Sequence, residues 1–281
     1  MLDGMSKPGL TAPVITIAGA PGAGKSTLGA LFPMPLFIQA EELSSVFDDW
    51  AEEDKPHTLP LLPSHDLALK KSPYDTIMKQ LDQIGRANTA ELRQQVRTLV
   101  IDSTSVLNAL MEVEIVEKDG SDSMGNACGG FHKAYEVAAG MHTKIIERAK
   151  RVCRKHNMAL IFLGHTIARK MRNRPDAEEY SVWTLDMGEK AAQVYYRLSD
   201  AVLFLTVEEF VRGGETSKKG ITTKSGKIIS TGQRIIVTCP EGKQGFSNAK
   251  NRMNLDALIK VPADSNPLLD LIPFYVANPL G

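Results

Sequence analysis

A short run near the amino terminus combines glycine, lysine and hydroxyl side chains at the spacing of a phosphate loop. It consists of Gly19, Ala20, Pro21, Gly22, Ala23, Gly24, Lys25, Ser26 and Thr27. This run fits the pattern G-x-x-x-x-G-K-[ST], in which the lysine reaches the β- and γ-phosphates and the hydroxyl binds Mg²⁺. The apolar residues 14–18 before it have the pattern of a strand, and residues 26–31 continue as a helix. The spacing therefore predicts that the chain binds a nucleoside triphosphate, and we expect ATP and Mg²⁺ as the ligands.

Carboxylates follow two further strand candidates, at the ends where open α/β sheets place their chemistry. Residues 98–101 end in Asp102, a pattern in which the strand aims an aspartate at Mg²⁺ or its water shell. Residues 36–40 are followed by Glu41 and Glu42. Taken alone, this acidic pair fits either a catalytic strand end or a solvated helix start.

A histidine and a group of cations follow the strand candidate at residues 158–163. His165 lies just past the strand end, where a polar residue could contact the γ-phosphate and report hydrolysis to the next loop; a hydrogen-bonded structural histidine is the alternative. The predicted loop after it carries the cations Arg169, Lys170, Arg172 and Arg174. In a chain without net charge, such a run suits contacts to a phosphate backbone, and Tyr180 and Trp183 could add base stacking. A second basic stretch, within residues 144–155, is typical of a solvated helix face and is the other nucleic-acid candidate.

Composition narrows the class of protein. The chain has 281 residues, 43% of them apolar, and a formal net charge of zero. Its cysteines, Cys128, Cys153 and Cys239, are far apart and form no C-x-x-C pair, which argues against a zinc site or disulfide framework and for a reducing cytoplasm. We see no signal peptide and no apolar run long enough to span a membrane, so we expect a cytoplasmic protein without a membrane partner.

The remaining pattern predicts an α/β fold. We expect a loose leader at residues 1–13, an irregular loop at 48–73 and then a helix with Ile77, Leu81 and Ile84 on one face. Further helices are expected at residues 104–117, 131–156 and 186–198, a strand at 201–205, and β-rich runs at 208–212, 226–230 and 234–239. These runs predict a C-terminal β-meander. Residues 261–281 contain Pro262, Pro267, Pro273 and Pro279, and we expect a tail with little regular structure there.

The order of these motifs, from residue 14 to residue 252, resembles the RecA-like ATPase core. Glu41 at its strand end looks like the water-activating glutamate of that family, and the Gly164-His165-Thr166 stretch is similar to the sensor strand end of the bacterial RadA branch. Lys250, Asn251 and Arg252 resemble a Lys-Asn-Arg motif whose cations reach a neighbouring subunit's nucleotide. At this chain length the resemblance is nearest to phage RecA-like single-strand annealing ATPases. It implies a P-loop NTPase core over residues 14–260, with a mostly parallel central sheet flanked by helices.

The resemblance also implies a mechanism and partners. Lys25, Ser26 and Asp102 would hold Mg·ATP, Glu41 would orient or deprotonate the attacking water, and His165 would sense the γ-phosphate. Lys250 and Arg252 would stabilise transition-state charge in trans, in a ring or short filament of identical subunits. The implied activity is a Mg-dependent, DNA-stimulated ATPase that binds single-stranded DNA and promotes annealing or recombination. If the chain is phage-encoded, the compartment would be the host cytoplasm.

Two other classes of protein use the same phosphate loop. A small-molecule or nucleoside kinase needs a substrate pocket and a lid of arginines, which residues 168–174 could supply. A nucleotide-switched scaffold for replication or packaging would bind ATP with little turnover. The sequence leaves both alternatives open.

Overall fold

The computed structural model describes residues 9–171, 180–213, 215–216, 222–224, 227–240 and 246–279. Arg172, Arg174 and the first eight residues of the expected leader lie outside these ranges. The strands are β1 (Val14–Gly19), β2 (Pro35–Gln39), β3 (His57–Thr58), β4 (Thr98–Asp102), β5 (Ala159–Met171), β6 (Tyr180–Leu185), β7 (Ala201–Arg212), β8 (Glu215–Thr216), β9 (Thr222–Lys224), β10 (Lys227–Val237), β11 (Phe246–Ser247), β12 (Lys250–Asn251) and β13 (Leu258–Val261). The α-helices are α1 (Lys25–Ala30), α2 (Pro73–Arg86), α3 (Thr89–Leu92), α4 (Thr104–Asp119), α5 (Lys133–His156), α6 (Glu189–Leu198), α7 (Leu268–Leu271) and α8 (Pro273–Ala277), with 3₁₀ turns at η1 (Ser44–Val46) and η2 (Ala127–Gly129).

Within the described residues, one large sheet runs in the order β13-β10-β7-β1-β5-β4-β2-β3. The pairs β7–β1, β1–β5, β5–β4, β4–β2 and β2–β3 are parallel, whereas β10 pairs antiparallel with both β7 and β13. The fold is therefore mixed α/β, with a mostly parallel central sheet and an antiparallel C-terminal extension, as predicted. The carboxyl ends of β1, β5, β4 and β2 meet at one edge, where parallel sheets place their sites.

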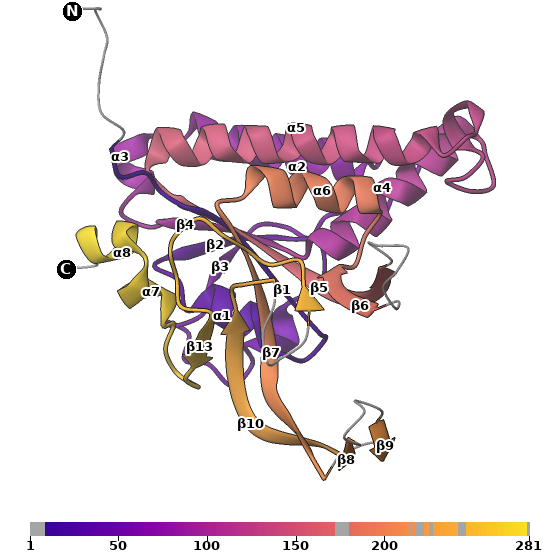
Figure 1. The fold of residues 1–281 in the computed structure, drawn as a ribbon. Coiled ribbons are helices and arrows are strands. Elements are labelled where there is room, and N and C mark those ends of the chain that lie inside the picture. The colour runs from indigo at the N-terminus through magenta and orange to yellow at the C-terminus, as the bar shows by residue number, and fades with distance from the viewer. Residues whose placement is uncertain are drawn as a thin grey trace, which may run out of the picture.

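Helices cover both faces of the sheet (Figure 1). Helices α2, α4, α5 and α6 pack on one face around a large apolar cluster, and α1, α7 and α8 pack on the other. Helix α2 begins where the Ser72 hydroxyl accepts the Asp75 amide hydrogen, and it buries Ile77, Leu81 and Ile84 as predicted. No helix of the described residues combines the length and apolar character needed to cross a lipid bilayer.

The structure differs from the sequence expectations mainly in the extent of its elements. Strand β7 joins the runs expected at 201–205 and 208–212, β10 joins those expected at 226–230 and 234–239, and β6 was not expected. Strand β5 does not end near residue 163 but continues to Met171 and pairs with β6, so Arg169 and Lys170 lie on a strand rather than in a loop. Residues 261–281 also contain more regular structure than expected. Helices α7 and α8 bury Leu268 and Phe274 in the cluster that contains α1. Proline is compatible with the first turn of a helix, and Pro273 occupies that position in α8.

Candidate active site

The phosphate loop joins β1 to α1 at the centre of the sheet edge. Gly24 has a φ of +88°, a backbone conformation that residues other than glycine rarely adopt. Gly19 lies so close to β7 that a Cβ atom built on it would be 2.6 Å from the Leu205 carbonyl oxygen. These two glycines therefore allow the loop to bend tightly against the neighbouring strand.

Lys25 is buried, and its ammonium group folds back over the loop. It donates hydrogen bonds to the carbonyl oxygens of Gly19 and Ala20, each at 3.0 Å, and its Nζ lies 3.3 Å from Nδ1 of His165. An ammonium group has three hydrogens and no acceptor, so these three contacts use its full capacity. Burial lowers the pKa of Lys25 below its usual value, while the nearby charges of Asp102 and Glu41 oppose that shift.

Asp102 and Ser26 form an oxygen-rich pair beside the loop. The Ser26 hydroxyl donates to Oδ2 of Asp102 at 2.6 Å, and the other carboxylate oxygen, Oδ1, is buried with no hydrogen-bond partner among the described residues. Burial raises the pKa of Asp102 to about 6, against the opposing effect of the Ser26 hydrogen bond. A buried, unpaired carboxylate oxygen beside a hydroxyl fits a hard cation such as Mg²⁺.

The described part of the chain contains no group of three or more histidine, cysteine, aspartate or glutamate side chains that could hold a metal by itself. Mg²⁺ commonly binds one or two protein oxygens and completes its shell with water and substrate phosphates. Ser26 and Asp102 therefore suit a magnesium ion that arrives with a nucleotide.

His165 connects the lysine to a glutamate. Its Nε2 lies 3.4 Å from Oε1 of Glu41. Because Lys25 can only donate, Nδ1 of His165 must accept, and the neutral ring then carries its hydrogen on Nε2, facing Glu41. The hydrogen bond from His165 lowers the pKa of Glu41, as do a hydrogen bond from Ser103 and the charge of Lys25, whereas burial opposes the shift.

Glu41, His165, Lys25, Ser26 and Asp102 are thus brought together at the sheet edge, as predicted from their places after β1, β2, β4 and β5. Glu42 is exposed to solvent, so Glu41 is the member of the acidic pair that faces the phosphate loop.

Hydroxyl side chains that the sequence reasoning missed support the histidine strand. The Ser105 hydroxyl accepts the backbone N–H of His165 at 3.0 Å, and the Thr104 hydroxyl donates to the Leu163 carbonyl oxygen at 3.0 Å. The available signal was the run of three hydroxyl residues directly after Asp102. The hydrogen bonds of Thr104 and Ser105 fix the position of β5 relative to the start of α4.

The predicted cation cluster is only partly assembled in the described residues. Successive side chains on a strand point to opposite faces, so Arg169 shares the face of His165 and Lys170 lies on the other. The Arg169 guanidinium donates to the Met187 carbonyl oxygen. The expectation of a single loop patch is therefore wrong for Arg169 and Lys170, because β5 continues through them.

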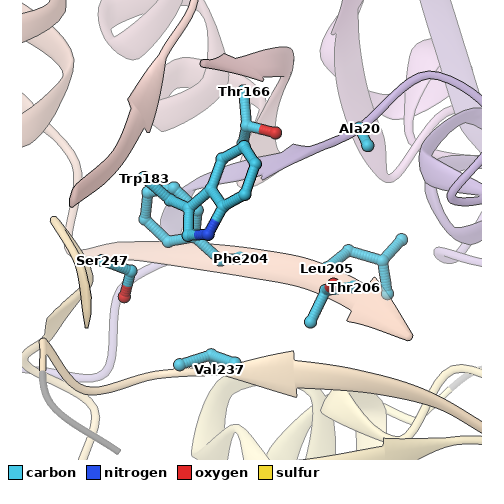
Figure 2. A pocket seen from close by; sticks show the side chains of 8 residues that line it. All are labelled: Ala20, Thr166, Trp183, Phe204, Leu205, Thr206, Val237 and Ser247. Carbon is cyan, nitrogen blue, oxygen red and sulfur yellow. The ribbon is translucent and has the colours of Figure 1, made fainter. Parts of the chain in front are cut away.

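Two recesses flank the histidine strand. Figure 2 shows the first, in which the indole of Trp183 faces a space bounded by Leu205, Thr206 and Val237, with Ala20 of the phosphate loop at its edge. Trp183 is 46% exposed, so it presents an aromatic side chain to solvent beside the loop. The second recess is a cleft of about 700 Å³ on the His165 side of β5, whose wall includes Glu112, Tyr135, His165, Arg169 and Asp186.

Lys250 and Arg252 lie away from the phosphate loop of their own chain. Strand β12 pairs with the first residues of β7, at the amino-terminal edge of the sheet. The Lys250 ammonium donates to the carbonyl oxygens of Tyr196 (2.8 Å), Arg197 (3.4 Å) and Ser199, at the carboxyl end of α6. Arg252 is exposed. The two cations thus contribute nothing to the site within one chain, and their action on a second copy remains a prediction.

The parallel sheet, the phosphate loop and the buried aspartate at the end of β4, at the same edge of the sheet, define a P-loop nucleotide-binding ATPase domain. The model of a known family, described as an AAA domain, matches residues 11–252, and the chain belongs to that family. No curated protein matches the chain significantly.

Proposed function

We propose that this protein is a RecA-like ATPase that hydrolyses ATP with Mg²⁺ and uses the cycle to control binding of single-stranded DNA, in annealing or recombination. The observation that carries the proposal is the continuous contact from Lys25 through His165 to Glu41. It links the phosphate loop to the strand that leads into the β5–β6 hairpin.

Nucleotide binding must change this contact. All three hydrogens of the Lys25 ammonium are used by Gly19, Ala20 and His165. To reach a β- or γ-phosphate, the lysine has to release at least one of these acceptors. If it releases His165, the imidazole can turn toward the γ-phosphate, and the position of β5 then depends on which nucleotide is bound.

Hydrolysis follows from the neighbouring groups. Glu41, ionised at neutral pH because its pKa lies below the usual value, accepts a proton from water as the water oxygen bonds to the γ-phosphorus and the bond to the ADP oxygen breaks. Ser26 and Asp102 would hold Mg²⁺, which neutralises charge on the phosphates when bound. Lys25 stabilises the charge that develops on the transferred phosphoryl group.

The hairpin is our candidate for the DNA contact. It begins at His165, carries Arg169 and Lys170, and presents the indole of Trp183, a half-exposed residue. Trp183 pairs with Ala168 and so shares the face of Lys170, whereas Arg169 lies on the opposite face. A cation beside an exposed aromatic ring suits single-stranded DNA, since the backbone is anionic and each base offers a flat face for stacking. We further propose a homo-oligomer in which Lys250 and Arg252 act on the nucleotide of the next subunit.

A specific observation favours a second candidate, a small-molecule or nucleoside kinase. The cleft of about 700 Å³ beside His165 is large enough for a nucleoside-sized acceptor. Asp186 and Glu112 in its wall could hold the hydroxyl groups of such an acceptor.

One experiment separates these functions. ATP turnover is measured alone, with single-stranded DNA, with duplex DNA of the same sequence and with a panel of nucleosides. Stimulation by single strands supports the RecA-like proposal, whereas a phosphorylated nucleoside supports the kinase. Slow turnover that no addition changes would contradict both and favour a nucleotide-switched scaffold.

A further inference from the structure

Arg234 lies against the phosphate loop although it is far away in the sequence. A Cβ atom built on Gly24 would be 2.5 Å from Nη1 of Arg234 and 3.7 Å from its Cζ. The guanidinium group therefore occupies the space beside the loop that a side chain at Gly24 would fill. Arg234 is therefore a second cation beside the phosphate loop, in addition to Lys25 within it.

The sheet explains how Arg234 reaches this position. In β10 it pairs with Val207 of β7, two residues beyond Leu205, which in turn lies beside Gly19 of β1. Side chains alternate along a strand, so Arg234 shares the face of Ile236, which packs in the same apolar cluster as Leu28 of α1. Arg234 thus projects past the end of the parallel strands, on the face that carries α1.

Two carbonyl oxygens hold the guanidinium group in place. Its Nη2 donates to Pro262 at 2.9 Å and to Ala263 at 3.2 Å, in the turn after β13. A guanidinium has five N–H donors. Its Nη1 donates to no acceptor in the part of the chain that the structure describes, and this is the nitrogen that faces Gly24.

The flank on which Arg234 lies indicates which part of a nucleotide it meets. His165, Asp102 and Glu41 follow β5, β4 and β2, all on one side of β1, whereas β10 lies on the other side, beyond β7. Since Lys25 lies near the first group and reaches the β- and γ-phosphates, the opposite flank of the loop is left for phosphates nearer the ribose. A guanidinium with free donors matches phosphate oxygens in both charge and geometry.

We propose that Arg234 is a nucleotide-binding residue that contacts phosphate oxygens common to ATP and ADP, held in position by the carbonyl oxygens of Pro262 and Ala263. This inference rests on the proposed nucleotide site and assigns to it a residue from the antiparallel part of the sheet. Arg234 would then set the affinity for the nucleotide, whereas Glu41 and the residues that contact it would set the rate of ATP hydrolysis.

The test measures the affinities of ATP and ADP for the parent and for Arg234→Ala. Loss of a charge-assisted contact should weaken both by about tenfold to a hundredfold, by the same factor, because the contact is to a part that both nucleotides contain. Arg234→Lys keeps the positive charge and should therefore lose less affinity than Arg234→Ala. It should still bind more weakly than the parent, because a lysine has no second arm to bind the carbonyl oxygens. Lys260→Ala removes an exposed cation from neighbouring β13 and should leave both affinities unchanged.

A role only in holding the turn after β13 predicts a different pattern. In that case thermal unfolding temperatures fall while both affinities stay at the parent value, and this result would overturn the inference. A loss confined to ATP, or an equal loss in Lys260→Ala, would also overturn it. If Arg234→Ala does not fold, Arg234→Lys decides by the same criteria. Lys25→Ala separates this inference from the proposed function. If the parent binds nucleotide and Lys25→Ala does not, the nucleotide site is supported. If both Arg234 variants then bind nucleotide as the parent does, only the role of Arg234 is wrong.

Discussion

Asp102 is fully buried, and its negative charge lowers the stability of the nucleotide-free protein. The shift of its pKa from 3.8 to about 6 means that ionisation is less favourable in the folded chain by roughly 3 kcal/mol. Asp102→Asn removes the charge but keeps the side-chain shape and an oxygen that can accept the Ser26 hydroxyl. It also replaces the unpaired carboxylate oxygen with an amide that lacks an acceptor, at a cost of about 1–3 kcal/mol. We expect a net gain of about 1 kcal/mol at neutral pH.

The direction of the pH dependence is the sharper result. An acid with a higher pKa in the folded than in the unfolded chain stabilises the folded state less as pH rises from 3.8 to about 6, and its contribution is constant above that range. Asparagine has no such dependence. Asp102→Asn should therefore be less stable than the parent near pH 4 and more stable near pH 7.

The assay is thermal or urea unfolding of the nucleotide-free proteins between about pH 4 and pH 8, since in a domain of about this size each kcal/mol shifts Tm by about 2–4 °C. Asp49→Asn, at an exposed position, controls for the loss of one carboxylate. With Mg²⁺ and ATP the order should reverse, because binding stabilises the parent and the variant lacks a metal ligand. A stability difference that is the same at every pH would refute the reasoning about burial.

Three further predictions concern the other groups of the site. Lys25→Ala should fold and lose most ATP affinity or turnover, measured by nucleotide binding and phosphate release; unchanged values for both would contradict the nucleotide site. Glu41→Gln should bind ATP but hydrolyse it about 10²–10⁴-fold more slowly, while Glu42→Gln should behave as the parent; the opposite order would assign the base to Glu42. Arg252→Ala should bind ATP and turn over slowly, and mixing it with Lys25→Ala should restore some activity; turnover per subunit that stays constant on dilution to a monomer would exclude action in trans.

Local motifs allowed the centre of the site to be predicted. The phosphate loop has a fixed spacing, and Asp102, Glu41 and His165 each end an apolar run, so their arrival at one sheet edge follows from parallel strand pairing. The contact between Lys25 and His165 could not be predicted to the same degree, because it depends on β1 and β5 being direct neighbours in the sheet. Arg234 was missed for the same reason: it reaches the loop only through the antiparallel order of β7 and β10.

The errors at the ends of elements have local physical causes. Cations in residues 168–174 favour a loop on composition, but β5 continues through Arg169 and Lys170, where a hairpin strand tolerates them because Lys170 is exposed and Arg169 donates to the Met187 carbonyl oxygen. Four prolines in residues 261–281 predicted irregular structure, yet Pro273 starts a helix. The apolar residues between these prolines, including Leu268 and Phe274, are buried on the α1 face.

The uninterrupted path of β5 from His165 to Arg169 limits how this hairpin can change in length. Inserting one residue between them would turn Arg169 to the opposite face and bring the Lys170 side chain to the cleft beside His165. Inserting two residues would lengthen the arm and leave each side chain on its original face. Engineered or natural lengthening of the hairpin should therefore be tolerated in steps of two residues, whereas odd steps exchange the cleft-facing and outward-facing sets of side chains.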